Sequence, residues 1–526
     1  ELISVTTGNP GTRANAASVA PSMSADGNIV AFMSRASNLA DFTFAGLWQV
    51  YVRDRAAGTT TLISRRGPLE PGNGDSFGPF VSPNGRYVAF LSDATNLVTG
   101  DTNGGTDAFV FDRVTQTLSR VSTRANGQEA AAQRLSVLAV DGQPLRPISI
   151  SDDGQIVAFR MWSSNIVSNL TQSAPAIFVK NRATQEVIAV PTTLAGVPIQ
   201  DFVSAEPLLS PDGLSLAFVS GLNTWTGTSG GGQQVFAVSI QRTPTLAALN
   251  RTRVSVNSAG VFANGLFSDG TGLTADGRFV AFTSDATNLL PGYTNDDPDL
   301  PGVNGVPTIY SFDRLDGTIR AISSLPNGAQ PDRRSFYATL TPSGSHAAFY
   351  SRASGLQPGI LDNGFRQVYV RGLSGGAGIG ASQVMSINSL GQLGDDESSL
   401  SQYVQLNADA TIVVYASKAD NLVPGDGNGY MEVFLTRRTN GPVTPGCSPA
   451  DVANTDGDPI PDDAIDNGDF STFFTAFFAA EGDPFQLVAD IANTDGETIV
   501  EGGGPDGVVD NGDFAAFFVY FFQGCP

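Results

Sequence analysis

Seven segments of the chain share one pattern of apolar and polar positions. Each predicts a short strand, a tight turn that is typically Asp-Gly or Asn-Gly, and a second strand that is mainly apolar, as in RYVAFLS at 86–92. Turns of this kind join antiparallel strands, and a continuous apolar run is typical of a strand buried on both faces. The copies start 58 to 69 residues apart and cover 23–39, 81–97, 150–166, 209–225, 273–289, 340–356 and 406–422.

A third strand-like segment follows each copy, and a fourth follows each of the first six. The third strands are expected at 49–55, 108–113, 177–182, 235–240, 308–314, 367–373 and 432–438, and the fourth at 59–66, 115–123, 184–192, 252–257, 317–324 and 382–388. The seventh repeat has no fourth strand of its own, whereas ELISVTT at 1–7 matches the fourth-strand pattern. We therefore expect the N-terminal strand to complete the last four-stranded sheet.

Seven units of four strands predict a mainly β fold, a seven-bladed β-propeller over residues 1–438. A shared last blade closes the ring and removes two open sheet edges. The Ser-Pro-Asp-Gly turn at 210–213, followed by an apolar strand, resembles the repeat of TolB-like propellers. That resemblance implies the fold and leaves the function open, because propellers host many activities.

Two polar features recur from repeat to repeat. An Asp-Arg pair follows the third strand, and an Asn follows the second. Because a single active site has no need of such recurrence, we interpret both as turn residues and expect the Asn side chains to bond local backbone. The residues are Asp54-Arg55, Asp112-Arg113 and Asp313-Arg314, and Asn38, Asn96, Asn165, Asn288 and Asn421.

Charge is distributed unevenly over the 526 residues. The formal net charge is −22, and residues 447–526 hold 16 Asp and Glu, no Lys or Arg, and 11 of the 33 Phe. This balance argues against a nucleic-acid partner, because phosphate contacts need clustered Lys and Arg. No apolar run approaches the roughly 20 residues that a membrane span requires.

Residues 450–479 and 489–522 are two copies of one acidic pattern that contains DNGDF. Acids in the back half of each copy are spaced as in an EF-hand calcium loop, and the front half is longer than in an ordinary loop. Phe residues follow at i, i+3, i+4, i+7 and i+8, which predicts one face of a helix. The candidate calcium ligands are Asp451, Asn454, Asp456, Asp462, Asp466 and Asp469, and Asp490, Asn493, Asp495, Asp506, Asp510 and Asp513. The alternative is that Asp469 and Asp513 are only helix N-caps.

The duplicated pattern resembles a dockerin of the type that is bounded by cysteines and ends in Gly-Cys-Pro. Cys447 opens the segment and Cys525 lies next to its last residue, after a short linker at 439–446. The resemblance covers 447–526 and implies a small helical, EF-hand-like calcium-binding domain that attaches its carrier to a partner. Cysteines at both ends suggest a disulfide and an oxidising compartment, so we expect a secreted or cell-surface protein in its mature form. Two free buried thiols are the alternative.

Two propeller loops also offer oxygen ligands. GDTNGGTD at 100–107 contains Asp101, Asn103 and Asp107, and GDGNGYME at 425–432 contains Asp426, Asn428 and Glu432. Oxygen donors that alternate with Gly resemble the first half of a calcium loop. A polar hairpin loop is the alternative at both places.

Three functions are compatible with this organisation. The chain is a non-catalytic structural or interaction protein, joined through its C-terminal domain to a partner protein or to neighbouring copies. Alternatively it is a module that binds a glycan or another ligand and is docked to a partner, or a polysaccharide-active enzyme. We expect the first, and we predict no catalytic residue, because no hydrolase domain with a G-x-S-x-G elbow follows the propeller and the sialidase Asp-box is absent from the repeat turns.

Overall fold

The computed structural model describes residues 1–438 except for 9–10, 40–45, 68–69, 134–145, 169, 171–173, 191–204, 222–231, 266–267, 294–304, 361–362, 374–381, 399–402 and 425–427. Glu1–Arg438 forms one compact unit. The predicted linker, the calcium ligands predicted within 447–526 and both cysteines lie outside the described residues, and so does Asp426. In the part of the chain that the structure describes, no helix has the length and apolar character that a membrane crossing requires.

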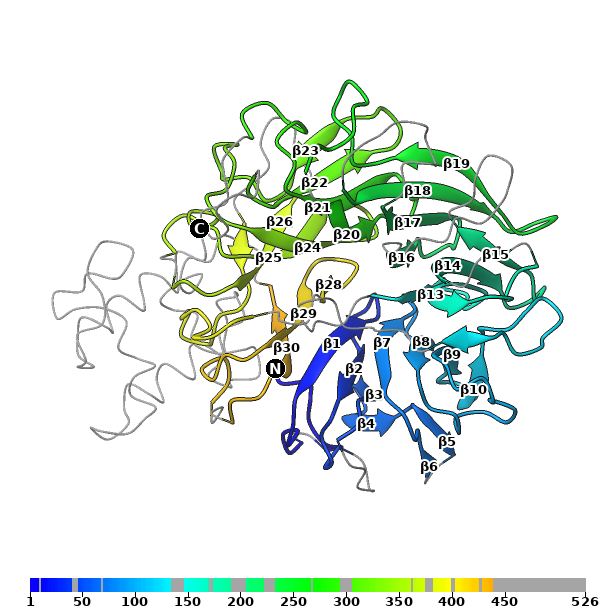
Figure 1. Ribbon diagram of the computed structural model, residues 1–526. Helices are drawn as coiled ribbons and strands as arrows, with labels where there is room; N and C mark the ends of the chain where they lie inside the picture. The colour runs from blue at the N-terminus through cyan, green and yellow to red at the C-terminus, as the bar shows by residue number, and fades with distance from the viewer. Residues whose placement is uncertain are drawn as a thin grey trace, which may run out of the picture. The chain divides into compact units, whose positions relative to one another are not determined.

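Each of the seven repeats forms one antiparallel sheet, numbered here as blades 1 to 7 (Figure 1). Blade 1 contains β1 (Ser18–Met23), β2 (Ile29–Ser34), β3 (Gln49–Asp54) and β4 (Thr59–Leu62). Blade 2 contains β7 (Ser76–Val81), β8 (Tyr87–Ser92), β9 (Asp107–Asp112) and β10 (Thr117–Arg120). Blade 3 contains β12 (Ile148–Ile150), β13 (Ile156–Ser163), β14 (Ala174–Asn181) and β15 (Val187–Val190), and β11 (Ala132–Gln133) pairs with β13.

The remaining blades follow the same order from the inner to the outer strand. Blade 4 contains β16 (Ala205–Leu209), β17 (Ser215–Ser220), β18 (Gln234–Gln241) and β19 (Ala247–Arg253). Blade 5 contains β20 (Ser268–Leu273), β21 (Phe279–Ser284), β22 (Thr308–Asp313) and β23 (Ile319–Ala321). Blade 6 contains β24 (Ser335–Leu340), β25 (His346–Ser351), β26 (Gln367–Gly372) and β27 (Gln383–Val384). Blade 7 contains β28 (Val404–Leu406), β29 (Ile412–Ser417) and β30 (Glu432–Arg437), and a separate hairpin contains β5 (Arg65–Gly67) and β6 (Glu70–Pro71).

The seven inner strands form a closed ring. Each of β1, β7, β12, β16, β20, β24 and β28 contacts the next inner strand, and β28 contacts β1. This circular order confirms the prediction of a seven-bladed β-propeller. The fourth strand of blade 4 differs from its prediction, since β19 begins five residues before the predicted 252–257. It starts earlier because β18 is long and continues to pair with β19 as far as Gln241.

The N-terminal residues complete blade 7, as the sequence predicts. Leu2 pairs with Phe434 of β30, and Figure 1 shows the N-terminus beside that strand. The Ile3 amide donates to the Val433 carbonyl at 2.8 Å, and the Leu435 amide donates to the Glu1 carbonyl at 2.8 Å. Ile3 is fully buried, so the first and last parts of the propeller share one hydrophobic core.

Every blade packs an aromatic ring of its second strand against one of its third strand. Ring centroids lie 5.7 to 6.1 Å apart, a separation at which aromatic pairs attract one another. Apolar second strands are therefore buried between neighbouring blades, as their sequence predicts. The pairs are Phe32–Tyr51, Phe90–Phe109, Phe159–Phe178, Phe218–Phe236, Phe282–Tyr310, Phe349–Tyr369 and Tyr415–Phe434.

The recurrent Asp and Arg have separate tasks. The Asp112 carboxylate accepts the Val114 amide at 2.9 Å, which is the expected turn role. Arg113 instead donates to the Gly85 carbonyl of its own blade at 2.8 Å and to Asp54 of the preceding blade at 2.9 Å. The Arg therefore ties adjacent blades together, a role that the interpretation as a turn residue missed.

The recurrent Asn side chains bond backbone, but not local backbone. Asn96 donates from Nδ2 to the Pro71 carbonyl at 3.0 Å and accepts the Asn73 amide at 2.9 Å. Asn288 makes the same contacts with Phe262 and Asn264. The expectation of a local turn is wrong, because each Asn holds the segment that crosses between blades, more than 20 residues earlier in the chain.

Three blades bury a cation at one equivalent position of the third strand. Arg53, Lys180 and Arg371 are each at most 5% exposed. Each donates to backbone carbonyls that follow the outer strand of the preceding blade: Arg53 to Thr6 and Lys180 to Thr123, at 3.2 and 3.1 Å. Burial lowers the pKa of Lys180 to about 8. These cations satisfy carbonyls that would otherwise lack donors at the interface between blades.

Candidate metal centre in the second blade

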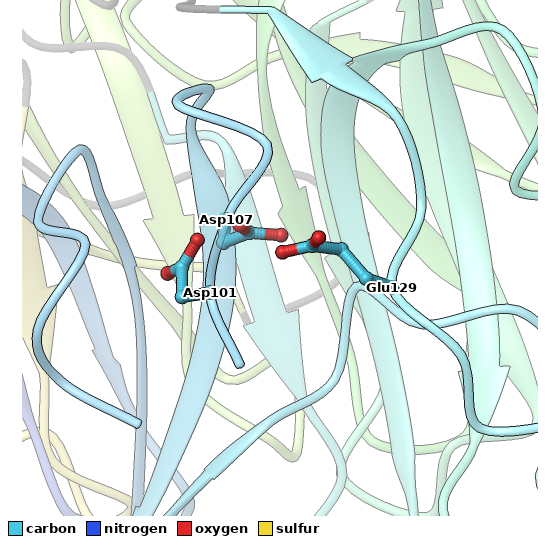
Figure 2. A group of neighbouring side chains, drawn as sticks. All are labelled: Asp101, Asp107 and Glu129. Carbon is cyan, nitrogen blue, oxygen red and sulfur yellow. The ribbon is translucent and has the colours of Figure 1, made fainter. Parts of the chain in front are cut away.

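Two segments of blade 2 bring three carboxylates together. The loop between β8 and β9 carries Asp101, and Asp107 is the first residue of β9. Glu129 lies on the segment that leaves β10, where it pairs with Thr123. One oxygen of each carboxylate lies within 4.8 Å of the others, and Figure 2 shows the three groups pointing toward one another. Among the described residues this is the one group of three or more acidic, His or Cys side chains close enough to share a cation.

Hydrogen bonds hold the loop against the segment that follows β10. Thr102 donates to Glu129 from its amide at 2.9 Å and from its hydroxyl at 2.7 Å. Asn103 Nδ2 donates to Asp107 Oδ2 at 2.9 Å and to the Ala130 carbonyl at 3.0 Å. These contacts fix the carboxylates of Asp107 and Glu129 before any ion is added.

The sequence predicts part of this arrangement. Asp101 and Asp107 lie together as expected, but Asn103 acts through its amide nitrogen, and its oxygen accepts the Gly105 amide at 2.7 Å. Its role is therefore to position Asp107. Glu129 was missed, because it lies 22 residues beyond Asp107 in a segment with no motif of its own.

Arg120 is the cation of the cluster. Its Nη1 lies 2.6 Å from Glu129 Oε1, 3.4 Å from Asp101 Oδ1 and 3.7 Å from Asp107 Oδ2. Its Nη2 donates to the Gly100 carbonyl at 3.0 Å. One guanidinium faces three carboxylates, so the formal charge of the group is −2.

Burial disfavours the charged form of these carboxylates. The side chains of Asp101 and Asp107 are only 2% and 1% exposed. Burial raises the pKa of Asp107 to about 6 and also raises the pKa of Asp101. Burial alone would raise the pKa of Glu129, but hydrogen bonds from Thr102 and Arg120 outweigh it and lower that pKa. Oδ1 of Asp101 is buried and accepts no hydrogen bond.

Other blades show what the Asp107 position needs for packing alone. Blades 1, 4 and 6 have Gln49, Gln234 and Gln367 there, opposite the last Ser of the second strand. In blade 1 the Gln49 amide donates to the Gly72 carbonyl at 3.1 Å and accepts the Ser64 hydroxyl at 2.6 Å. A neutral amide therefore satisfies this position, and the buried carboxylate of blade 2 adds charge that packing does not require.

The matching loop of blade 7 is arranged differently. Asn428 Nδ2 donates to Glu432 at 3.1 Å, as Asn103 does to Asp107. Arg13 takes the place that Glu129 has in blade 2, because it pairs with Val5 as Glu129 pairs with Thr123. Arg13 contacts Glu432 at 3.3 Å, so the described part of this loop pairs one carboxylate with one cation.

A second feature of the propeller is a cavity of about 830 Å³ on the outer side of blades 2 to 4. Among the described residues it is bounded by Arg124, Asn126 and Asn165 and by apolar residues of β15 and β19. Its volume is in the range of small-molecule sites. A smaller cavity, of about 80 Å³, lies among the inner strands and is lined mostly by apolar side chains, together with Arg146, Thr339 and Gln405.

No family model and no curated protein matches the chain. Solved structures that are similar to it include an oligogalacturonate lyase in complex with manganese, at 13% identity and a TM-score of 0.46, covering 82% of this chain and 92% of that one. The β-propeller domain of the Trilobed protease from Pyrococcus furiosus is 12% identical, with a TM-score of 0.43 and coverage of 82% and 99%. TolB from Acinetobacter baumannii is 14% identical, with a TM-score of 0.35 and coverage of 80% and 79%. The assignment of the propeller rests on the strand order and ring closure described above.

Proposed function

We propose that the chain is a secreted, non-catalytic interaction scaffold. Its propeller is joined to a partner protein or to neighbouring copies through a calcium-dependent docking domain at 447–526. The observation that carries this proposal is the acidic DNGDF pattern, which occurs twice and is followed each time by a stripe of Phe. A helix cap accounts for one acid in each copy, whereas calcium accounts for the whole set of oxygen ligands.

The docking domain depends on calcium in this proposal because of its charge. Sixteen acids with no Lys or Arg repel one another when the segment becomes compact. Bound calcium offsets that repulsion, and binding energy at such a site is folding energy. The two Phe stripes then pack against each other, and a disulfide between Cys447 and Cys525 joins the ends of the domain.

The propeller supplies a rigid body in this proposal. Its ring is closed by the N-terminal strand, and Arg side chains such as Arg113 join neighbouring blades. A closed ring has no open end at which another strand would add, so assembly is directed to the C-terminal domain.

The proposal is tested by sedimentation velocity of the full chain in calcium chloride and in EGTA, alone and with candidate partners. Self-association or partner binding in calcium that is lost in EGTA supports it. Asp466→Asn with Asp510→Asn is expected to abolish the association, whereas Asp483→Asn, which also removes an acid from the segment, keeps it. Association that is the same in EGTA contradicts a calcium-dependent dock.

A ligand-binding module is the second candidate, and the cavity of about 830 Å³ favours it. Its polar groups, Arg124, Asn126 and Asn165, stand beside apolar strands, as in many ligand sites. Binding of the full chain to a glycan array, lost in Asn126→Leu and kept in Asn327→Leu on an exposed turn, would support this candidate. Turnover of any glycan would contradict the non-catalytic assignment.

A further inference from the structure

We propose that Asp101, Asp107 and Glu129 form a calcium site in blade 2, and that Arg120 is the cation that calcium displaces. This site belongs to the propeller and does not depend on the C-terminal domain. All three groups offer carboxylate oxygen, and the group that they form among the described residues contains no imidazole or thiolate. Such hard ligands select calcium or magnesium over zinc or copper.

The first support is the convergence of charge in a buried place. Three carboxylates share one guanidinium, and the side chains of Asp101 and Asp107 are almost fully buried. A buried carboxylate needs a partner of opposite charge, and one Arg120 neutralises only a third of this group. A divalent ion offsets two charges at once.

The second support is independent of the number of acids. Oδ1 of Asp101 is buried and accepts no hydrogen bond, although buried polar atoms are nearly always hydrogen-bonded. Arg120 approaches it at 3.4 Å without a hydrogen bond. This oxygen faces the guanidinium nitrogen that also lies near Asp107 and Glu129, so an ion in place of that nitrogen would satisfy it.

The third support comes from the other blades. Three of them keep a neutral Gln where blade 2 has Asp107, and blade 7 has Arg13 where blade 2 has Glu129. Blade 2 therefore differs from blades 1, 4 and 6 at the first position and from blade 7 at the second, and both differences add negative charge to one place. Neither difference is required to close the sheet.

Arg120 is placed so that it can give way to the ion. It lies on β10, the outer strand of its blade, and its side chain is 10% exposed. When its guanidinium turns toward solvent it also frees the Gly100 carbonyl, which accepts Nη2 at 3.0 Å. That carbonyl and water then add oxygen ligands, since calcium takes six to eight.

The test uses the full chain and a signal confined to the propeller. All three tryptophans, Trp48, Trp162 and Trp225, lie within residues 1–438. Thermal unfolding followed by Trp fluorescence is measured in EGTA and in calcium chloride. Calcium at a hundredfold excess over Kd is expected to raise the midpoint by about 3 °C for a unit of this size.

Asp101→Asn and Glu129→Gln remove ligands without changing shape and are expected to lose the shift. The matched control is Glu432→Gln, which changes the equivalent acid of blade 7 to the residue that three blades have there. It is expected to keep the shift. A wild-type midpoint unchanged by calcium would show that Arg120 is the permanent counter-ion and would overturn the site.

Calorimetric titration with calcium chloride gives a second readout that does not require unfolding. Asp101→Asn is expected to bind one ion fewer than wild type, whatever number the C-terminal domain binds. Equal stoichiometry would overturn the site. The double variant Asp466→Asn with Asp510→Asn is expected to lose the C-terminal ions and to keep the calcium-dependent shift in the Trp-detected midpoint. The blade 2 site and the C-terminal docking domain are therefore tested separately.

Discussion

Closure of the ring by the N-terminal strand makes a sharp prediction for Ile3. Its side chain is fully buried. It belongs to one hydrophobic cluster with Val30, Phe32, Val433 and Leu435. Truncation of a buried Ile to Ala removes transfer free energy and leaves a cavity, which together cost about 2–5 kcal/mol. We expect Ile3→Ala to lower the free energy of unfolding by about 3 kcal/mol, a large share of the 5–15 kcal/mol of a typical domain.

The assay is urea unfolding of the full chain in calcium, followed by Trp fluorescence. Val114→Ala is the matched control, because Val114 is 71% exposed and its truncation is expected to change stability by less than about 0.5 kcal/mol. Hydrogen exchange adds a local readout, since the Leu435 amide donates to the Glu1 carbonyl. It should exchange faster in the Ile3 variant than in wild type.

Deletion of residues 1–7 is a stronger form of the same test. It leaves β30 as an open edge, and it removes the Thr6 carbonyl that accepts the buried Arg53. We expect loss of stability together with aggregation. If Ile3→Ala and the deletion both unfold at the wild-type urea midpoint, the ring closes in some other way and the argument is refuted.

Three further predictions concern charged groups. In EGTA at pH 8, Asp107→Asn is expected to stabilise the propeller by about 1–3 kcal/mol, because it removes a buried charge; a less stable variant in urea unfolding would contradict this. Hydrogen bonds from Arg86 lower the pKa of Asp112 to about 2, below its unfolded value. Its contribution, about 1 kcal/mol after solvent screening, is therefore present above pH 4 and lost as pH falls toward 2, and Asp112→Asn should flatten acid unfolding in that window. Lys180→Met leaves buried carbonyls without a donor and should cost about 3 kcal/mol, whereas Lys180→Arg should cost less than about 1 kcal/mol; equal losses in thermal melts would refute the carbonyl role.

The strands were predictable because their signals are local. An apolar run after a tight turn recurs seven times, and the same residues form β2, β8, β13, β17, β21, β25 and β29. Ring closure was predictable as well, because the missing strand of blade 7 and the extra strand at 1–7 complement each other. The early start of β19 was not, since it depends on how far β18 extends.

Only the part of the candidate metal centre that lies in one loop was predictable from the sequence. Asp101 and Asp107 lie in one loop, so spacing alone brings them together. Glu129 and Arg120 reach the same place through the pairing of β9 with β10 and the bridge between Thr123 and Glu129. Side chains that meet through strand register leave no motif in the sequence of one blade.

The recurrent Asn side chains show the same limit. Their recurrence indicated a structural role, and the structure gives them one. Their partners lie on the segment that enters each blade, as for Asn38 with Arg13 and Asn421 with Leu393. A repeat pattern therefore predicted that these residues matter to the fold, but not which segment they hold.

We propose that calcium directs assembly through residues 447–526. The most direct measurement is electron microscopy of the purified full chain, first in calcium chloride and then in EGTA, with any identified partner present. We expect ordered assemblies or partner complexes in calcium, which separate into single propellers in EGTA. Single propellers under both conditions, or assemblies that persist in EGTA, would contradict it.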